Sequence, residues 1–175
     1  MLNLQNDDVI KALGNGEIII SHFSGTSMYP LLKSGKDRVV IAPVDGALKK
    51  NDVPLYKGDN GKLVLHRIIY VKSDGYVIRG DNLYRNEYNV TDEKIVGVLK
   101  GIYKGDKLYN CDTDFWYKLY VCFIRVSFPF RYVFVILLRP CLVKIKLHKQ
   151  QFFELVKVPL QMKIFFSINQ KKSDR

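Results

Sequence analysis

The sequence predicts a mainly β domain that carries a short N-terminal helix and a basic, helical C-terminal appendage. The β class is predicted because short segments rich in β-branched residues recur along the first two thirds of the chain, separated by Gly and Asp. The charge distribution predicts the appendage. Residues 1–114 hold 16 basic and 15 acidic side chains, whereas residues 115–175 hold 12 basic and only 2 acidic ones. We therefore expect a near-neutral domain over residues 1–114, followed by a basic, apolar segment over residues 115–175.

The first half of the domain is predicted to contain one helix and three strands. Residues 6–13 begin with capping residues and end before Gly14-Asn15-Gly16, which is typical of a short helix. β-branched and apolar residues predict strands over residues 17–23, Arg38–Ala42 and 53–57. Residues 24–30 are predicted to form a loop, because glycine and proline bracket them.

The second half is predicted to contain a hairpin and one further strand. Residues 62–72 (KLVLHRIIYVK) are expected to form a single long strand. The turn at residues 73–75 (Ser-Asp-Gly) leads it back into a strand over residues 76–79. Residues 94–104 form the next strand, and the domain is expected to end near residue 114.

Ser27 is the first candidate for chemistry. It lies in the loop Gly-Thr-Ser-Met-Tyr-Pro (residues 25–30), directly after a predicted strand. Glycine in this loop allows a substrate backbone to come close, and the backbone N–H of Ser27 could donate to an oxyanion. The alternative is a turn serine that caps a backbone N–H group.

His66 and Asp81 are candidates on neighbouring strands. Alternation along residues 62–72 places His66 on a face with Val64 and Ile68, where burial lowers the imidazole pKa and keeps the ring neutral. The alternative is a structural histidine of the core. The two strands of the hairpin run side by side from the turn, so we expect Asp81 to lie near the level of His66. A carboxylate in that position can fix the tautomer of an imidazole.

These stretches together resemble the signal peptidase-like serine peptidases, a superfamily that also contains the self-cleaving repressors. The resemblance covers roughly residues 17–104, and it rests on GTSMYPLLKSGKD (25–37), NDVPLY (51–56), VLHRI (64–68), GDN (80–82) and IVGVLKGI (95–102). It implies a signal peptidase/repressor-like mixed β fold. Since a histidine stands in the base position, the similarity is to the Ser–His branch of the superfamily.

The resemblance also implies roles for individual residues. Ser27 matches the nucleophile, His66 the general base and Asp81 the acid of the GDN motif. The Ser–His enzymes place a further acid a few residues past that motif, so Glu87 is an alternative to Asp81. The implied activity is that of a serine endopeptidase cleaving a peptide or preprotein through an acyl-enzyme.

We expect no cofactor and no metal site. Three cysteines without CxxC spacing argue against both a disulfide scaffold and a zinc ribbon. The rival to the peptidase is a catalytically inactive, peptidase-like binding module at a membrane surface.

The basic segment over residues 115–175 favours a membrane surface over nucleic acid as its partner. Aromatic and aliphatic residues interleave with its cations, and a nucleic-acid arm needs far fewer apolar residues. Residues 119–138 have the length of a membrane span, but Arg125, Pro129 and Arg131 interrupt them. An arginine at the bilayer centre costs roughly 2.5–3.5 kcal/mol. We therefore expect an interfacial segment, with packed helices or a true span as the alternatives.

The domain is expected in the cytoplasm or peripheral to the inner face of the membrane. The residues before Ser27 are mostly polar and include Asp7 and Asp8, which argues against a secretory signal or an anchor at that point. They hold one short helix, too little for the helix-turn-helix of a repressor, so no nucleic-acid partner is expected.

Overall fold

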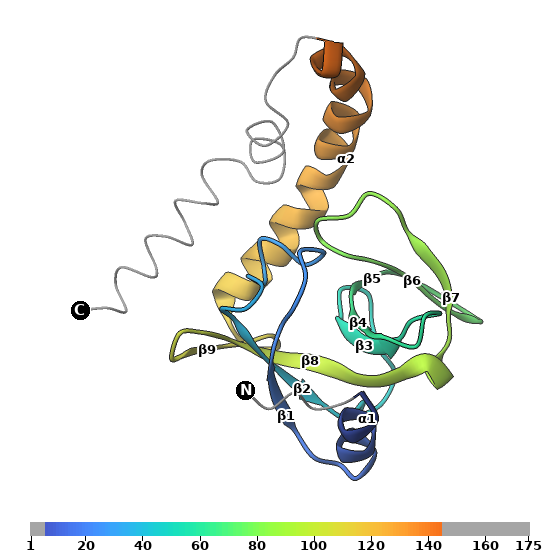
Figure 1. Cartoon of the computed structure of the whole chain (residues 1–175), viewed down its shortest axis with the longest axis vertical. Helices are drawn as coiled ribbons and strands as arrows, with labels where there is room; N and C mark the ends of the chain where they lie inside the picture. Colours follow the sequence, from blue (N-terminus) through green and yellow to red (C-terminus); the bar gives the residue numbers. More distant parts are fainter. Residues whose placement is uncertain (1–5, 145–175) are drawn as a thin grey trace. The chain divides into compact units, whose positions relative to one another are not determined.

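The computed structural model describes the backbone of residues 6–144 and the side chains of residues 6–135 (Figure 1). The chain divides after Lys118 into two units. The charge balance changes after residue 114. The helix that leads from the first unit into the second begins at the next residue.

The first unit is mainly β and has a short N-terminal helix, as the sequence predicts. Its elements in chain order, with the helix that follows them, are α1 (Asn6–Gly14), β1 (Ile19–His22), β2 (Arg38–Ala42), β3 (Pro54–Lys57), β4 (Leu63–Leu65), β5 (Arg67–Lys72), β6 (Gly75–Arg79), β7 (Glu87–Val90), η1 (Asp92–Lys94), β8 (Ile95–Lys104), β9 (Lys107–Asn110) and α2 (Phe115–Lys144). The sequence did not predict β7, η1 or β9.

The strands form two antiparallel sheets that curl into a half-barrel. One sheet has the order β1-β2-β8-β3-β4, with β9 paired to β8, and the other has the order β5-β6-β7. β8 is the longest strand of this unit, and it pairs with β2, β3 and β9 (Figure 1). β5 and β6 form the predicted hairpin, in which Lys72 pairs with Gly75 across the two-residue turn.

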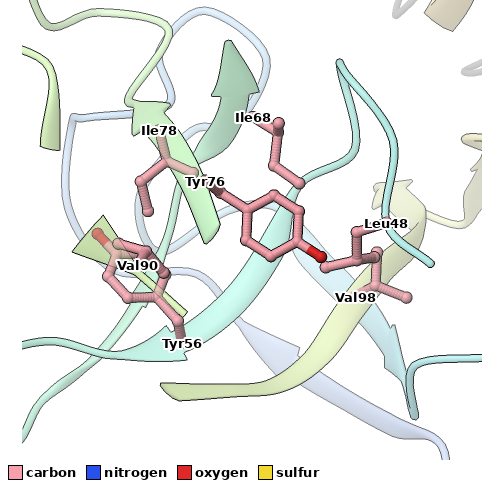
Figure 2. Packing of buried hydrophobic residues seen from close by; sticks show 7 residues of the cluster. All are labelled: Leu48, Tyr56, Ile68, Tyr76, Ile78, Val90 and Val98. Atoms are coloured by element: carbon pink, nitrogen blue, oxygen red, sulfur yellow. The ribbon is translucent and has the colours of Figure 1, made fainter. Parts of the chain in front are cut away.

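The core lies between the two sheets. One cluster of buried side chains draws on β3 and β8 from the larger sheet, on all three strands of the smaller sheet, and on the loop before β3 (Figure 2). Its members are Leu48, Tyr56, Ile68, Tyr76, Ile78, Val90 and Val98. Since both sheets contribute, the apolar area removed from water holds them together.

The prediction of a single strand over residues 62–72 is wrong. The segment breaks at His66 into β4, which pairs with β3, and β5, which pairs with β6 in the other sheet. The expected alternation fails there as well, because the four residues from Leu65 to Ile68 are all buried. Where a chain passes from one packed sheet to another, both of its faces are covered by protein. Side chains on both faces are then buried, so an alternating pattern of apolar and polar residues no longer shows which ones are buried.

Within the described part of the basic segment, α2 is one continuous helix of 30 residues. Over residues 6–144, none of the helices combines the length and the apolar character that crossing a membrane requires. The helix continues through Pro129, which the sequence suggested as an interruption. Residues 145–175, the remainder of the predicted basic segment, lie outside the described residues.

Candidate active site

Ser27 lies in the loop between β1 and β2 and is half-buried. Gly25 has a φ of 109°, in the region that favours glycine, and its N–H donates to Ser34 Oγ at 3.1 Å. Further along, Lys104 Nζ at the end of β8 donates to the Leu31 carbonyl at 2.7 Å and lies 3.0 Å from an Asp37 carboxylate oxygen. These contacts fix both ends of the loop that holds the candidate nucleophile.

The GDN segment packs directly on the serine. The backbone N–H of Asn82 donates to the Ser27 carbonyl at 2.8 Å, and its side-chain amide donates to the Thr26 carbonyl at 3.1 Å. A Cβ built on Gly80 would lie 2.7 Å from the Ser27 carbonyl oxygen and 3.0 Å from Ser27 Cβ. Only glycine allows this approach, so two motifs that are 53 positions apart in the chain meet at one backbone contact.

His66 lies next to one end of the same hairpin. In the β5–β6 ladder the outermost pair is Arg67 with Arg79, so His66 directly precedes one member of that pair and Gly80 directly follows the other. The hairpin end that adjoins His66 is therefore the end that leads into the glycine on which Ser27 packs. No hydrogen bond links the Ser27 hydroxyl to the His66 ring among the described residues. In enzymes without substrate such bonds are often long, and they tighten when substrate binds.

Glu87 holds the His66 ring. Its Oε1 lies 2.8 Å from His66 Nδ1, and its Oε2 accepts a hydrogen bond from the Tyr56 hydroxyl at 2.5 Å. The Tyr56 oxygen is also 3.2 Å from Nδ1. An Nδ1–H that donates to the carboxylate leaves Nε2 of a neutral ring as the acceptor, which is the tautomer that a general base requires.

Burial keeps this imidazole neutral, as the sequence predicted. The His66 side chain is about 6% exposed, and loss of hydration lowers its pKa below the ordinary value; Glu87, and then Asp81, oppose that shift. Since burial is the larger effect, the neutral ring predominates at neutral pH and can take a proton.

Asp81 is engaged elsewhere. Its carboxylate accepts two hydrogen bonds from Arg67, from Nε at 2.8 Å and from Nη2 at 2.7 Å, and both side chains are buried. Arg67 Nη1 also donates to the Asn51 carbonyl at 2.9 Å and to the Tyr117 hydroxyl at 3.2 Å. The sequence left two acids open as partners of the imidazole, and Glu87 is the one that contacts it. Asp81 instead binds Arg67, the residue that follows His66.

A cleft of about 500 Å³ opens beside Ser27. β1 and β4, the two end strands of the larger sheet's path, both line it. Its apolar lining residues are Val9, Ile19, Phe23, Val39, Ile41, Leu55, Leu63, Val64 and Leu65. Its polar lining residues are Asn6, Ser21, His22, Ser24 and Ser27. His66 is not part of the lining, but it directly follows Leu65. Apolar residues outnumber polar ones in this lining, and three of the polar residues carry hydroxyls, a mixture that binding sites usually show.

Tyr56 is the site residue that the sequence missed. It lies in β3 within NDVPLY, and its buried ring belongs to the core cluster (Figure 2). Its hydroxyl reaches Glu87 and His66. A buried tyrosine hydroxyl usually has a polar partner, but that rule does not say which one.

Nothing in the described part of the chain suggests a metal centre. No three His, Cys, Asp or Glu side chains among residues 6–135 gather closely enough to hold an ion. Cys111 and Cys122 are free thiols, and burial raises the pKa of the Cys111 thiol to about 12.

Comparison of the chain with protein-family models and with curated proteins finds no match. The likeness to signal peptidase-like enzymes therefore stays a prediction, and the chemistry of the site depends on its geometry.

Proposed function

We propose that this protein is a serine endopeptidase of the signal peptidase-like type, in which Ser27 is the nucleophile and His66 the general base. One observation carries the proposal. A buried, neutral imidazole is held at Nδ1 by Glu87, and it directly precedes the β5–β6 ladder at the end that leads into the glycine on which Ser27 packs. A serine hydroxyl is a weak nucleophile until such a base accepts its proton.

The proposed reaction proceeds in two stages. His66 Nε2 takes the proton from Ser27 Oγ as this oxygen attacks a peptide carbonyl, and the imidazolium then protonates the leaving amine. Water, deprotonated by the same nitrogen, attacks the acyl-enzyme and releases the acid. Glu87 stabilises the imidazolium in both stages.

The substrate proposed is an extended peptide or preprotein with apolar side chains. The cleft beside Ser27 supports this, since nine of its fourteen lining residues are apolar and edge strand β1 contributes to the lining. A peptide can add to a sheet edge through backbone hydrogen bonds while its side chains enter the pockets.

A fluorophosphonate probe tests the nucleophile. We expect covalent labelling of Ser27, identified by mass spectrometry, in the intact chain. Labelling should be lost in Ser27→Ala and should fall by at least about 10²-fold in His66→Ala. Ser24→Ala is the matched control, because Ser24 lines the same cleft. A folded protein that the probe does not label would instead be the inactive binding module.

Two amide variants separate the acids. Glu87→Gln should slow labelling by about 10²-fold or more, since the imidazolium loses its partner, while thermal stability changes little. Asp81→Asn should lower the free energy of unfolding by about 3–5 kcal/mol, because it leaves the buried Arg67 guanidinium without its counter-charge. Slow labelling of a fully stable Asp81→Asn protein would assign the orienting role to Asp81.

We further propose that the domain lies in the cytoplasm or peripheral to the inner face of the membrane. The 12 basic and 2 acidic residues of the segment 115–175 support this location, because the cytoplasmic leaflet is the anionic one. Cell fractionation tests it, and recovery from the outer compartment would contradict it.

A further inference from the structure

α2 presents an apolar face that is exposed to solvent. Along an α-helix, residues three or four positions apart lie on one face. One such row is exposed over its whole length, and we call it the outer face: Leu119, Cys122, Val126, Phe130 and Val133. Val126 is 63% exposed and Phe130 is 75% exposed. A row of large apolar side chains in water indicates an interaction surface.

Basic residues border this face. Lys118 and Arg125 are both exposed and lie seven positions apart, so they follow one edge of the row. The sequence of α2 contains five basic residues and no acidic residue. Long cationic side chains beside an apolar row can reach lipid headgroups while the row enters the acyl boundary.

We infer that α2 lies flat on an anionic membrane surface, with its outer face in the lipid and its basic edge at the headgroups. The inference does not depend on the chemistry at Ser27. An orientation along the surface buries the outer face in the acyl boundary and leaves Lys118 and Arg125 at the level of the headgroups.

The charge of α2 favours an anionic membrane as its partner over nucleic acid and over a second copy of α2. Nucleic acid would neutralise the cations but leave the apolar row in water. A second copy of α2 would cover the row, but it would bring five more basic residues and no acidic partner. An anionic bilayer satisfies both features at once.

Binding of the full-length chain to vesicles tests the inference. Vesicles that contain phosphatidylglycerol should bind the protein, vesicles of phosphatidylcholine alone should bind it much less, and binding should weaken as salt rises. The single tryptophan, Trp116, is exposed in the first turn of α2, so its fluorescence should shift to the blue on binding.

Variants identify the surface. Val126→Ser combined with Phe130→Ser should abolish vesicle binding. The matched control makes the same change at two exposed apolar residues of the β domain, Val71→Ser with Leu108→Ser, and should bind as the parent does. Arg125→Gln should weaken binding roughly fivefold. Circular dichroism checks that each variant is folded.

Three results would overturn the inference. The first is equal binding to neutral and anionic vesicles, and the second is binding that the outer-face variant leaves unchanged. The third is a lipid-free dimer in analytical ultracentrifugation that Val126→Ser with Phe130→Ser converts to monomer, since this would make the row a contact between copies.

Discussion

Tyr56 illustrates how one residue can serve both packing and chemistry. Its ring fills the core between the sheets, and its hydroxyl donates to the Glu87 carboxylate that holds His66. Burial, and after it the hydrogen bond to Glu87, raises the pKa of this phenol above its ordinary value, so it remains a donor at neutral pH. We regard Tyr56 as a positioning residue that acts through Glu87.

Tyr56→Phe should slow probe labelling of Ser27 by about tenfold, equivalent to roughly 1.4 kcal/mol, because Glu87 loses the donor that orients it. Tyr76→Phe is the matched control. Tyr76 belongs to the same cluster and donates to a carboxylate of Asp92 at 2.7 Å, away from His66. Both variants should lose similar stability in urea. Equal labelling rates in the two would remove Tyr56 from the site.

At the scale of elements, the close contact between β6 and the serine loop decides the geometry. The last residue of β6 leads into Gly80, against which the Ser27 backbone packs. β4 and β5 break at His66, one residue before the outermost pair of the β5–β6 ladder. The serine loop and the segment that joins the two sheets therefore both adjoin the same end of that hairpin.

Gly80→Ala should displace the serine loop, because the new Cβ would lie 2.7 Å from a backbone oxygen that cannot move alone. We expect a loss of about 1–3 kcal/mol in the free energy of unfolding and slower probe labelling. Gly14→Ala, where a Cβ meets no atom within 4 Å, is the control and should be neutral or better. Unchanged labelling in Gly80→Ala would show that the contact does not control Ser27.

At the scale of the whole molecule, the buried imidazole makes stability depend on pH. The pKa of His66 is lowered in the folded state, mainly by burial, so as the pH falls below about 6.5 the unfolded chain takes up the proton first. Protons bound preferentially by the unfolded state destabilise the fold. The stability contributed by His66 is therefore fully present above that pH and declines below it.

Urea unfolding at neutral and mildly acidic pH measures this effect. The midpoint of the parent protein should fall on acidification by more than that of His66→Gln, which lacks the buried group. His22→Gln changes an exposed histidine and should behave as the parent does. Identical pH dependence in His66→Gln and the parent would contradict the assignment.

The sequence by itself determined the parts that depend on local chemistry. Turn residues and β-branched runs predicted the hairpin at residues 73–75, β2 and the whole of β8, and charge counting separated the basic segment. The motifs also identified Ser27 and His66 as candidates, because residue type and loop position are visible in one dimension.

Only the tertiary structure decided how the candidates are arranged. The break at His66 depends on which sheet each half of the segment joins, and the register of β5 and β6 shifts at a bulge between Ile68 and Tyr70. After that shift the outermost pair is Arg67 with Arg79, so a count made from the turn without the bulge is off by one residue. Glu87 and Tyr56 reach the ring from other strands, and such contacts follow from packing between sheets, which no local pattern encodes.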